Sequence, residues 1–156
     1  MTNRTLNCFF FLSLFIFSVS CDLTPRIHKE ILRAQELIEV QRYGDAAQLY
    51  EKIILKSPNK NVQLKIFYQL GELYSIHLAK HRLAIVNFEK VKEVTEDPLW
   101  LVKSEEKLGE IKYTYLKDYE SSKNSYERLV NFKPRLKNVE FYEDRLVNIY
   151  ISLEEY

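Results

Sequence analysis

The chain has few residues that break helices and no excess of charge of either sign. Its 156 residues include only three glycines and four prolines, which argues against a turn-rich β architecture and favours helices. The formal net charge is +1, so the chain lacks the basic surface with which proteins bind nucleic acid. Hydrophobic residues make up 46%, enough for a folded core. We therefore expect one helical domain with no nucleic-acid partner.

Cysteine is also scarce, and both cysteines, Cys8 and Cys21, lie near the N-terminus. Residues 6–19 are almost wholly apolar and follow Arg4, the only charged residue among the first 20. This run is shorter than the roughly 20 residues that a bilayer-spanning helix needs, but it suits a secretory signal. Removal of the signal leaves Cys21 as the only cysteine, which excludes an internal disulfide.

The residues before Cys21 resemble the lipobox of bacterial lipoproteins. Ser18, Val19 and Ser20 are small or short, although the family usually has leucine where Ser18 stands. The resemblance implies a lipoprotein signal peptide over residues 1–20, a palmitate-type lipid on Cys21 and a lipidated tether over residues 21–26. Two other interpretations stay open: an ordinary signal with a chance cysteine, and an uncleaved N-terminal anchor.

The rest of the chain, residues 27–156, repeats with a 38-residue period. A fixed period in the range of roughly 20–50 residues is typical of helical and other repeat proteins. The recurring positions are Leu32, Leu70, Leu108 and Leu146; Tyr43, His81 and Tyr119; Ala46, Ala84 and Ser122; Tyr50, Phe88 and Tyr126; and Ile53, Val91 and Leu129.

Apolar residues within each repeat recur at helical spacing, and no segment alternates for long enough to form a strand. The pattern predicts three helix pairs and a closing helix over residues 139–153. Gly44 is expected to mark the first helix–helix turn, with Asp45 as the N-cap of the next helix. Ile149, Tyr150 and Leu153 of the closing helix have no second helix to cover them, so they either pack back or dock a partner.

The second helix of each pair resembles the second half of a tetratricopeptide repeat (TPR). The family's aromatic, small and apolar positions are filled by the columns above, and Leu70-Gly71 and Leu108-Gly109 match its first helix. The family's period is 34, four residues shorter than this one, and its first-helix tryptophan is missing here. The resemblance implies an all-α, TPR-like α-solenoid of three helix pairs plus a C-terminal closing helix.

In that family the first helices line the concave, partner-binding surface. The resemblance therefore points to the aromatic residues of the first helices, since tyrosine is a frequent interface anchor. These candidates are Tyr68, Tyr74, Tyr113, Tyr115 and Tyr150. Trp100 fits a packing role equally well.

Little in the sequence indicates catalysis. His77 and His81 have the spacing that brings two imidazoles to one helix face for zinc, but they sit at a polar corner with no acidic residue between them. No phosphate-binding loop or nucleophile elbow is present. We expect no enzyme activity, catalytic residue, metal, cofactor or small-molecule substrate.

The leading hypothesis is a membrane-anchored scaffold that binds a protein or peptide partner in the cell envelope. An exported TPR lipoprotein resembles the outer-membrane assembly lipoproteins of the Bam complex, which favours the periplasmic face of the outer membrane. In the lipoproteins of enteric bacteria, an aspartate directly after the lipid site, as Asp22 is here, favours the inner membrane instead. Two alternatives stay open: an accessory factor of peptidoglycan or envelope machinery, with a weak enzymatic or carbohydrate-binding role, and a surface-exposed lipoprotein.

Overall fold

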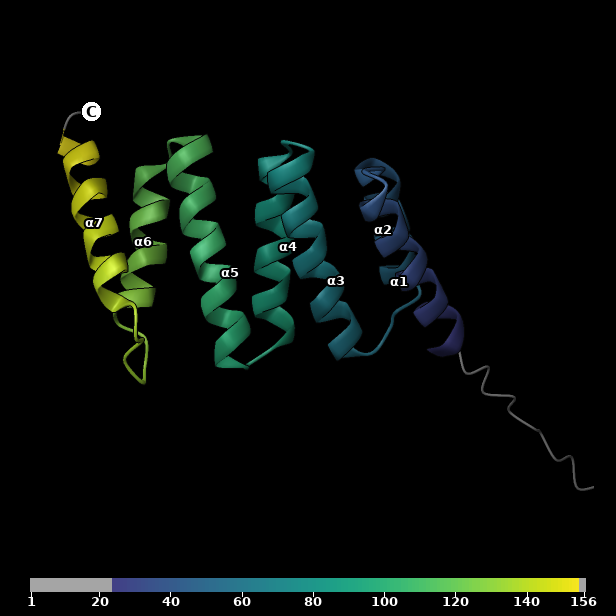
Figure 1. Cartoon of the computed structure of the whole chain (residues 1–156). Coiled ribbons are helices and arrows are strands. Elements are labelled where there is room, and N and C mark those ends of the chain that lie inside the picture. Colours follow the sequence, from purple (N-terminus) through teal and green to yellow (C-terminus); the bar gives the residue numbers. More distant parts are fainter. Residues whose placement is uncertain (1–23, 155–156) are drawn as a thin grey trace, which may run out of the picture.

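The structure is a computed structural model that describes residues 24–154, and every regular element in that range is helical. The prediction of an all-α fold is confirmed for these residues. The helices stand side by side in a row that begins with α1 and ends with α7 (Figure 1). Their bounds are α1 (Thr24–Glu39), α2 (Tyr43–Ile54), α3 (Lys60–Glu72), α4 (His81–Val94), α5 (Pro98–Ile111), α6 (Tyr119–Val130) and α7 (Val139–Glu154).

Consecutive helices pack against each other along this row. The most extensive contacts join α1 with α2, α3 with α4, α5 with α6, and α6 with α7; α2 also touches α3, and α4 touches α5. Asn59, Asp97 and Asp118 cap α3, α5 and α6 by accepting a hydrogen bond from a backbone N–H of the first turn. Residues 24–26, expected to belong to the tether, begin α1.

The turn between α1 and α2 differs from the prediction. Gly44 lies inside the first turn of α2, so it is not the turn residue, and Asp45 is not the N-cap. Asp45 instead accepts a hydrogen bond from Arg42 Nε at 2.6 Å. The left-handed residue is Gln41 (φ 60°), held there because the Arg42 N–H bonds back to the Leu37 carbonyl. Left-handed residues recur at the same 38-residue interval, at Ala79 and Lys117.

A π-helical turn ends the first helix of the second and third pairs but not α1. The segment η1 (Leu73–His77) continues α3, and η2 (Lys112–Leu116) continues α5. The hydrogen bonds that close the three corners run from Arg42 to Leu37, from Lys80 to Tyr74 and from Asp118 to Lys112. The last two bonds span one residue more than the first, because a π-turn takes in an extra residue.

The missing π-turn shifts the buried face of α1 by one residue. Ala34 is fully buried and takes the place that Gly71 and Gly109 hold in α3 and α5. Leu32 shares a 38-residue column with the buried Leu70 and Leu108 but is itself 46% exposed. The column changes environment in α1 because the 38-residue interval crosses a π-turn in the later repeats and not in α1.

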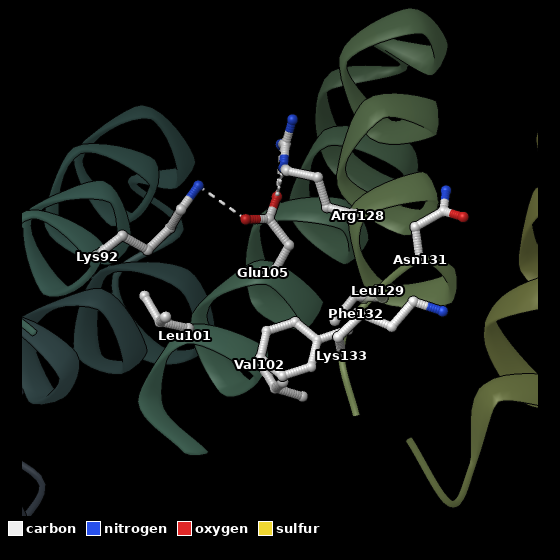
Figure 2. A pocket seen from close by; sticks show the side chains of 9 residues that line it. All are labelled: Lys92, Leu101, Val102, Glu105, Arg128, Leu129, Asn131, Phe132 and Lys133. Carbon is white, nitrogen blue, oxygen red and sulfur yellow. Dashed lines mark hydrogen bonds and ion pairs between the residues drawn. The ribbon is translucent and has the colours of Figure 1, made fainter. Parts of the chain in front are cut away.

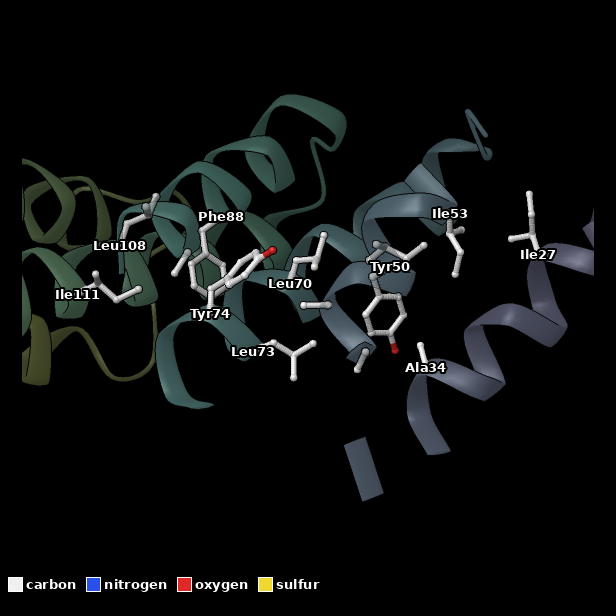
Figure 3. Close-up of a cluster of buried hydrophobic side chains, with 14 residues drawn as sticks. Ile27, Ala34, Tyr50, Ile53, Leu70, Leu73, Tyr74, Phe88, Leu108 and Ile111 are labelled. Atoms are coloured by element: carbon white, nitrogen blue, oxygen red, sulfur yellow. The ribbon is translucent and has the colours of Figure 1, made fainter. Parts of the chain in front are cut away.

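Each pair closes on an aromatic ring of its second helix that lies against a small residue of its first. Phe88 is fully buried, and a Cβ built on Gly71 would lie 2.7 Å from its ring. Tyr126 approaches Gly109 in the same way, at 2.8 Å. In the first pair, Tyr50 lies beside Ala34 (Figure 3). Burial of one such ring contributes about 1.5–3 kcal/mol, which makes these contacts a main source of stability.

The closing helix α7 packs back onto the third pair. Tyr142 and Ile149 are buried in a cluster with Tyr126 and Leu129, and Leu153 packs against it. The Tyr142 hydroxyl also donates a hydrogen bond to Glu106 of α5. The sequence left open whether the uncovered residues of the closing helix pack back or dock a partner. Ile149 and Leu153 pack back.

We expect Gly71→Ala to lower the free energy of unfolding by about 1–3 kcal/mol, because the new methyl group overlaps a ring that has no room to move. Gly44→Ala is the matched control: a Cβ at Gly44 meets nothing within 4 Å and the position is helical. This control should raise stability by about 0.5–1 kcal/mol. Urea unfolding followed by circular dichroism measures both. Equal effects of the two substitutions would contradict the close-contact account.

Candidate functional site

The five tyrosines that the sequence predicts as partner contacts lie in different environments in the structure. Tyr74 is only 5% exposed, and its hydroxyl donates to Glu51 Oε1 at 2.5 Å, so it is a core residue and not a surface contact. Burial of the ring and the hydrogen bond to Glu51 both raise the pKa of Tyr74, which keeps it neutral. Tyr74 joins α2 to the end of the next first helix and thus holds the first two pairs together.

The same connection recurs in each of the next two repeats. Lys112 Nζ lies 3.9 Å from a Glu89 carboxylate oxygen, and the Tyr150 hydroxyl donates to Glu127 at 3.1 Å. Tyr150 is nevertheless 47% exposed, so part of its ring remains open to a partner. The repeat thus places an acidic residue of each second helix against a hydroxyl or ammonium group of the following first helix.

Tyr115 and Tyr113 lie at the end of the third first helix. Tyr115 is 53% exposed and stacks on His81, with ring centroids 4.0 Å apart. Tyr43 stacks on His77 in the same way, with ring centroids 3.8 Å apart, so each histidine packs against a different tyrosine. Tyr113 is half-buried beside Tyr119. Within residues 24–154, no three His, Cys, Asp or Glu side chains gather closely enough to hold a metal ion.

Tyr68 packs against a residue that lines the first candidate site. Its half-buried ring packs edge-on against Trp100 at 5.1 Å and Phe88 at 5.4 Å, and burial raises its pKa to about 12. Trp100 in turn lines a groove of about 500 Å³ across α1, α3 and α5. We call this the first-helix groove; its lining is His28, Ile31, Leu32, Gln35, Tyr50, Val62, Lys65, Ile66, Gln69 and Trp100.

The chemistry of the first-helix groove suits an extended polypeptide. Gln35 and Gln69 each carry an amide that both donates and accepts hydrogen bonds, which is what a peptide backbone requires. Leu32 and Trp100 add apolar surface, and no carboxylate lines the groove. Sequence reasoning missed Gln35, Gln69 and Leu32. The first two carry no pattern of their own, and Leu32 was noted only as a member of a repeat column.

A second hollow, of about 450 Å³, lies where α4, α5 and α6 meet (Figure 2). We call it the Glu105 pocket; it is lined by Lys92, Leu101, Val102, Glu105, Arg128, Leu129, Asn131, Phe132 and Lys133. With three cations and one carboxylate around apolar side chains, it offers a positively charged environment.

Glu105 is buried at the edge of this pocket and is neutralised from both sides. Its Oε1 accepts hydrogen bonds from Arg128 Nε at 2.9 Å and Nη2 at 2.5 Å, and Oε2 lies 2.7 Å from Lys92 Nζ. Burial alone would raise the pKa of the Glu105 carboxyl. The hydrogen bonds and charges of Arg128 and Lys92 together outweigh burial and hold this pKa below its usual value.

The residues at the positions of Glu105 and Lys92 change along the repeat. One period earlier they are Phe67 and Ile54, and one period later they are Glu143 and Val130. The pattern thus has opposite charges at both positions in this repeat and apolar residues at both in the preceding one. Because replacing a buried ion pair with packed apolar groups is often neutral or stabilising, packing does not require the ion pair.

Comparison of the chain with protein-family models, with curated proteins and with solved structures finds no match. Cys21 and residues 1–20, on which the lipidation and export predictions rest, lie outside the described residues. None of the helices over residues 24–154 is both long enough and apolar enough to cross a bilayer.

We expect Glu105→Gln to lower the free energy of unfolding by about 1–3 kcal/mol at pH 7, because Arg128 loses its counter-charge and Lys92 keeps only that of Glu89. The double variant Lys92→Ile with Glu105→Phe, which restores the side chains of the preceding repeat, should match or exceed wild-type stability. Chemical denaturation of the three proteins tests this, and a double variant less stable than Glu105→Gln would contradict it.

The pH dependence gives an independent check on the same prediction. Because the pKa of Glu105 is lower in the folded state than its ordinary 4.5, its contribution is fully present above pH 4.5. That contribution is lost as the pH falls through the folded-state pKa. The stability gap between wild type and Glu105→Gln should therefore close in acid.

Proposed function

We propose that the protein is a non-enzymatic scaffold of TPR-like helix pairs, tethered to a bacterial membrane through a lipid on Cys21. Its first-helix groove binds an extended segment of a protein partner in the cell envelope. The observation that carries this proposal is the groove itself, in which two side-chain amides, an indole and an exposed leucine face one channel across α1, α3 and α5.

Recurrent contacts support the solenoid part of the proposal. The left-handed corner residue, the stacked ring pair and the acidic link between pairs each recur at the 38-residue interval. Contacts that repeat between neighbouring units are what a repeat array requires, because each unit is stabilised by the next. Such arrays present long surfaces to extended partners.

The lining of the groove supports binding without chemistry. Its polar side chains are the amides of Gln35 and Gln69, the hydroxyl of the buried Tyr50, and His28 and Lys65 at exposed positions. A general acid or nucleophile needs a second group that activates it within hydrogen-bond reach, and this lining offers no carboxylate for that purpose. The envelope setting, including a role in outer-membrane protein assembly, rests on the sequence up to Cys21 and on the family resemblance.

Leu32→Glu tests the groove, because it places a desolvated charge where a partner would pack. We expect this variant to lower the yield of partner cross-linked to the full-length protein in its own membranes by about tenfold, the effect of losing an interface anchor. Leu55→Glu is the matched control, since Leu55 is 82% exposed and outside the groove. Equal yields from both variants would rule out the groove as the binding surface.

A separate test addresses the anchor. The wild-type protein should incorporate a palmitate analogue and sediment with membranes, and Cys21→Ser should lose both properties because it has no thiol to acylate. Metabolic labelling followed by fractionation measures this. A wild-type protein that incorporates no palmitate analogue would disprove the lipid anchor and leave the groove proposal standing.

A further inference from the structure

Within residues 24–154, the outer faces of α1 and α7 at the two ends of the row are exposed, and the repeat relates their positions to buried faces of the other helices. In α3 and α5, the side that carries Gly71 or Gly109 packs against the second helix of the same pair. The corresponding stripe on α7 is exposed, with Val147 at the glycine position. It consists of Glu140, Asp144, Val147 and Ile151.

A second helix of the usual kind does not fit this α7 stripe. Phe88 and Tyr126 reach within about van der Waals contact of a backbone that has no side chain, at Gly71 and Gly109. Val147 places a branched side chain at that point, and it is 57% exposed. Whatever packs on this face must therefore stay further from the α7 backbone than Phe88 and Tyr126 are from α3 and α5. It contacts the side chains of Val147 and Ile151 instead.

The opposite end of the row offers such a surface. In α3 and the following η1, Ile66, Leu70 and Leu73 are each 2% exposed and belong to one core cluster with residues of the first pair. Figure 3 shows Leu70 and Leu73 on the side of Tyr50. No pair precedes α1 in residues 24–154, and the same side of α1 is polar and exposed. Its stripe is Lys29, Arg33, Glu36 and Val40.

The two stripes complement each other in charge. Both have helical spacings of four, three and four residues, so a parallel alignment places Lys29 opposite Glu140 and Arg33 opposite Asp144. Val40 then lies opposite Ile151, and both are at least half exposed. Among the described residues, none of these four charged side chains lies within ion-pair distance of an opposite charge. Glu36 lies opposite Val147, which its methylene groups can cover while its carboxylate stays at the rim.

We propose that a second copy of this chain docks there, with the α1 stripe of one copy against the α7 stripe of another. This contact is head-to-tail, so it uses two different surfaces and leaves one of each free for further copies. Exposed ion pairs contribute little each, so the association is weak and sensitive to salt. Tethering to one membrane would raise the local concentration and favour it. The proposal does not depend on the first-helix groove.

A zero-length carbodiimide cross-linker, which joins an amine directly to a carboxylate, tests the contact in the full-length protein in detergent. We expect a Lys29–Glu140 cross-link, identified by mass spectrometry of the dimer band. Because α1 and α7 lie at opposite ends of the row, this cross-link can only join two copies (Figure 1). The dimer should decrease when salt is added.

Charge reversal makes the test specific. Glu140→Lys with Asp144→Lys, and Lys29→Glu with Arg33→Glu, should each abolish the dimer, since like charges then meet. Mixing the two variants should restore it, because each again offers a charge opposite to the other. Lys60→Glu with Lys137→Glu, at exposed sites outside both stripes, is the control and should dimerise like the wild type.

Three results would overturn the proposal. They are a dimer that persists in either reversed variant, a mixture that fails to restore the dimer, and the absence of a Lys29–Glu140 cross-link in the wild type. Circular dichroism of each variant shows whether it is folded. If a variant is folded and gives one of these results, the α1 stripe does not bind the α7 stripe. Leu32→Glu should dimerise normally, which separates this proposal from the groove.

Discussion

The fold depends on one close contact repeated along the row, in which a ring of a second helix presses on a small residue of the first. Phe88 on Gly71 and Tyr126 on Gly109 leave no room for a Cβ, and Ala34 serves Tyr50 in the first pair. The contact sets the distance between paired helices and orients the first helix around its axis. That orientation decides which residues face the next pair and which are exposed, so the first-helix groove, the links between pairs and both end faces depend on it.

Departures from the repeat mark the positions where packing alone does not explain the residue. At one junction, Glu105 and Lys92 replace an apolar pair, and a hollow adjoins them. In α7, Val147 stands where α3 and α5 have glycine and α1 has Ala34. In α1, a polar stripe occupies the side that α3 uses for burial. A uniform array would not need these substitutions, and together they make the two ends and the third junction chemically distinct.

Much of the architecture was predictable because helices carry a strong periodic signal. The all-α class and the position of the closing helix follow from apolar spacing, and Gly71 and Gly109 were matched to the small positions of a first helix. The candidate site was less predictable. Tyr74 is buried although it lies on a first helix, and Leu32 is exposed although it lies in an apolar column. Gln35 and Gln69 gave no signal, because a lone amide becomes a binding group only when another helix places a second one across a groove.

The sequence by itself determined the helices, their approximate ends and the rings that fill the pairs, because these follow from local spacing and burial. It also carries the N-terminal segment on which the export hypothesis rests. Only the tertiary structure decided the orientation of each helix, because the π-turns after α3 and α5 insert one residue that a count along the chain does not reveal. A shift of one residue rotates a helix face by about 100°, since an α-helix has about 3.6 residues per turn. That rotation buries Ala34, exposes Leu32 and brings α1 and α3 together around the first-helix groove.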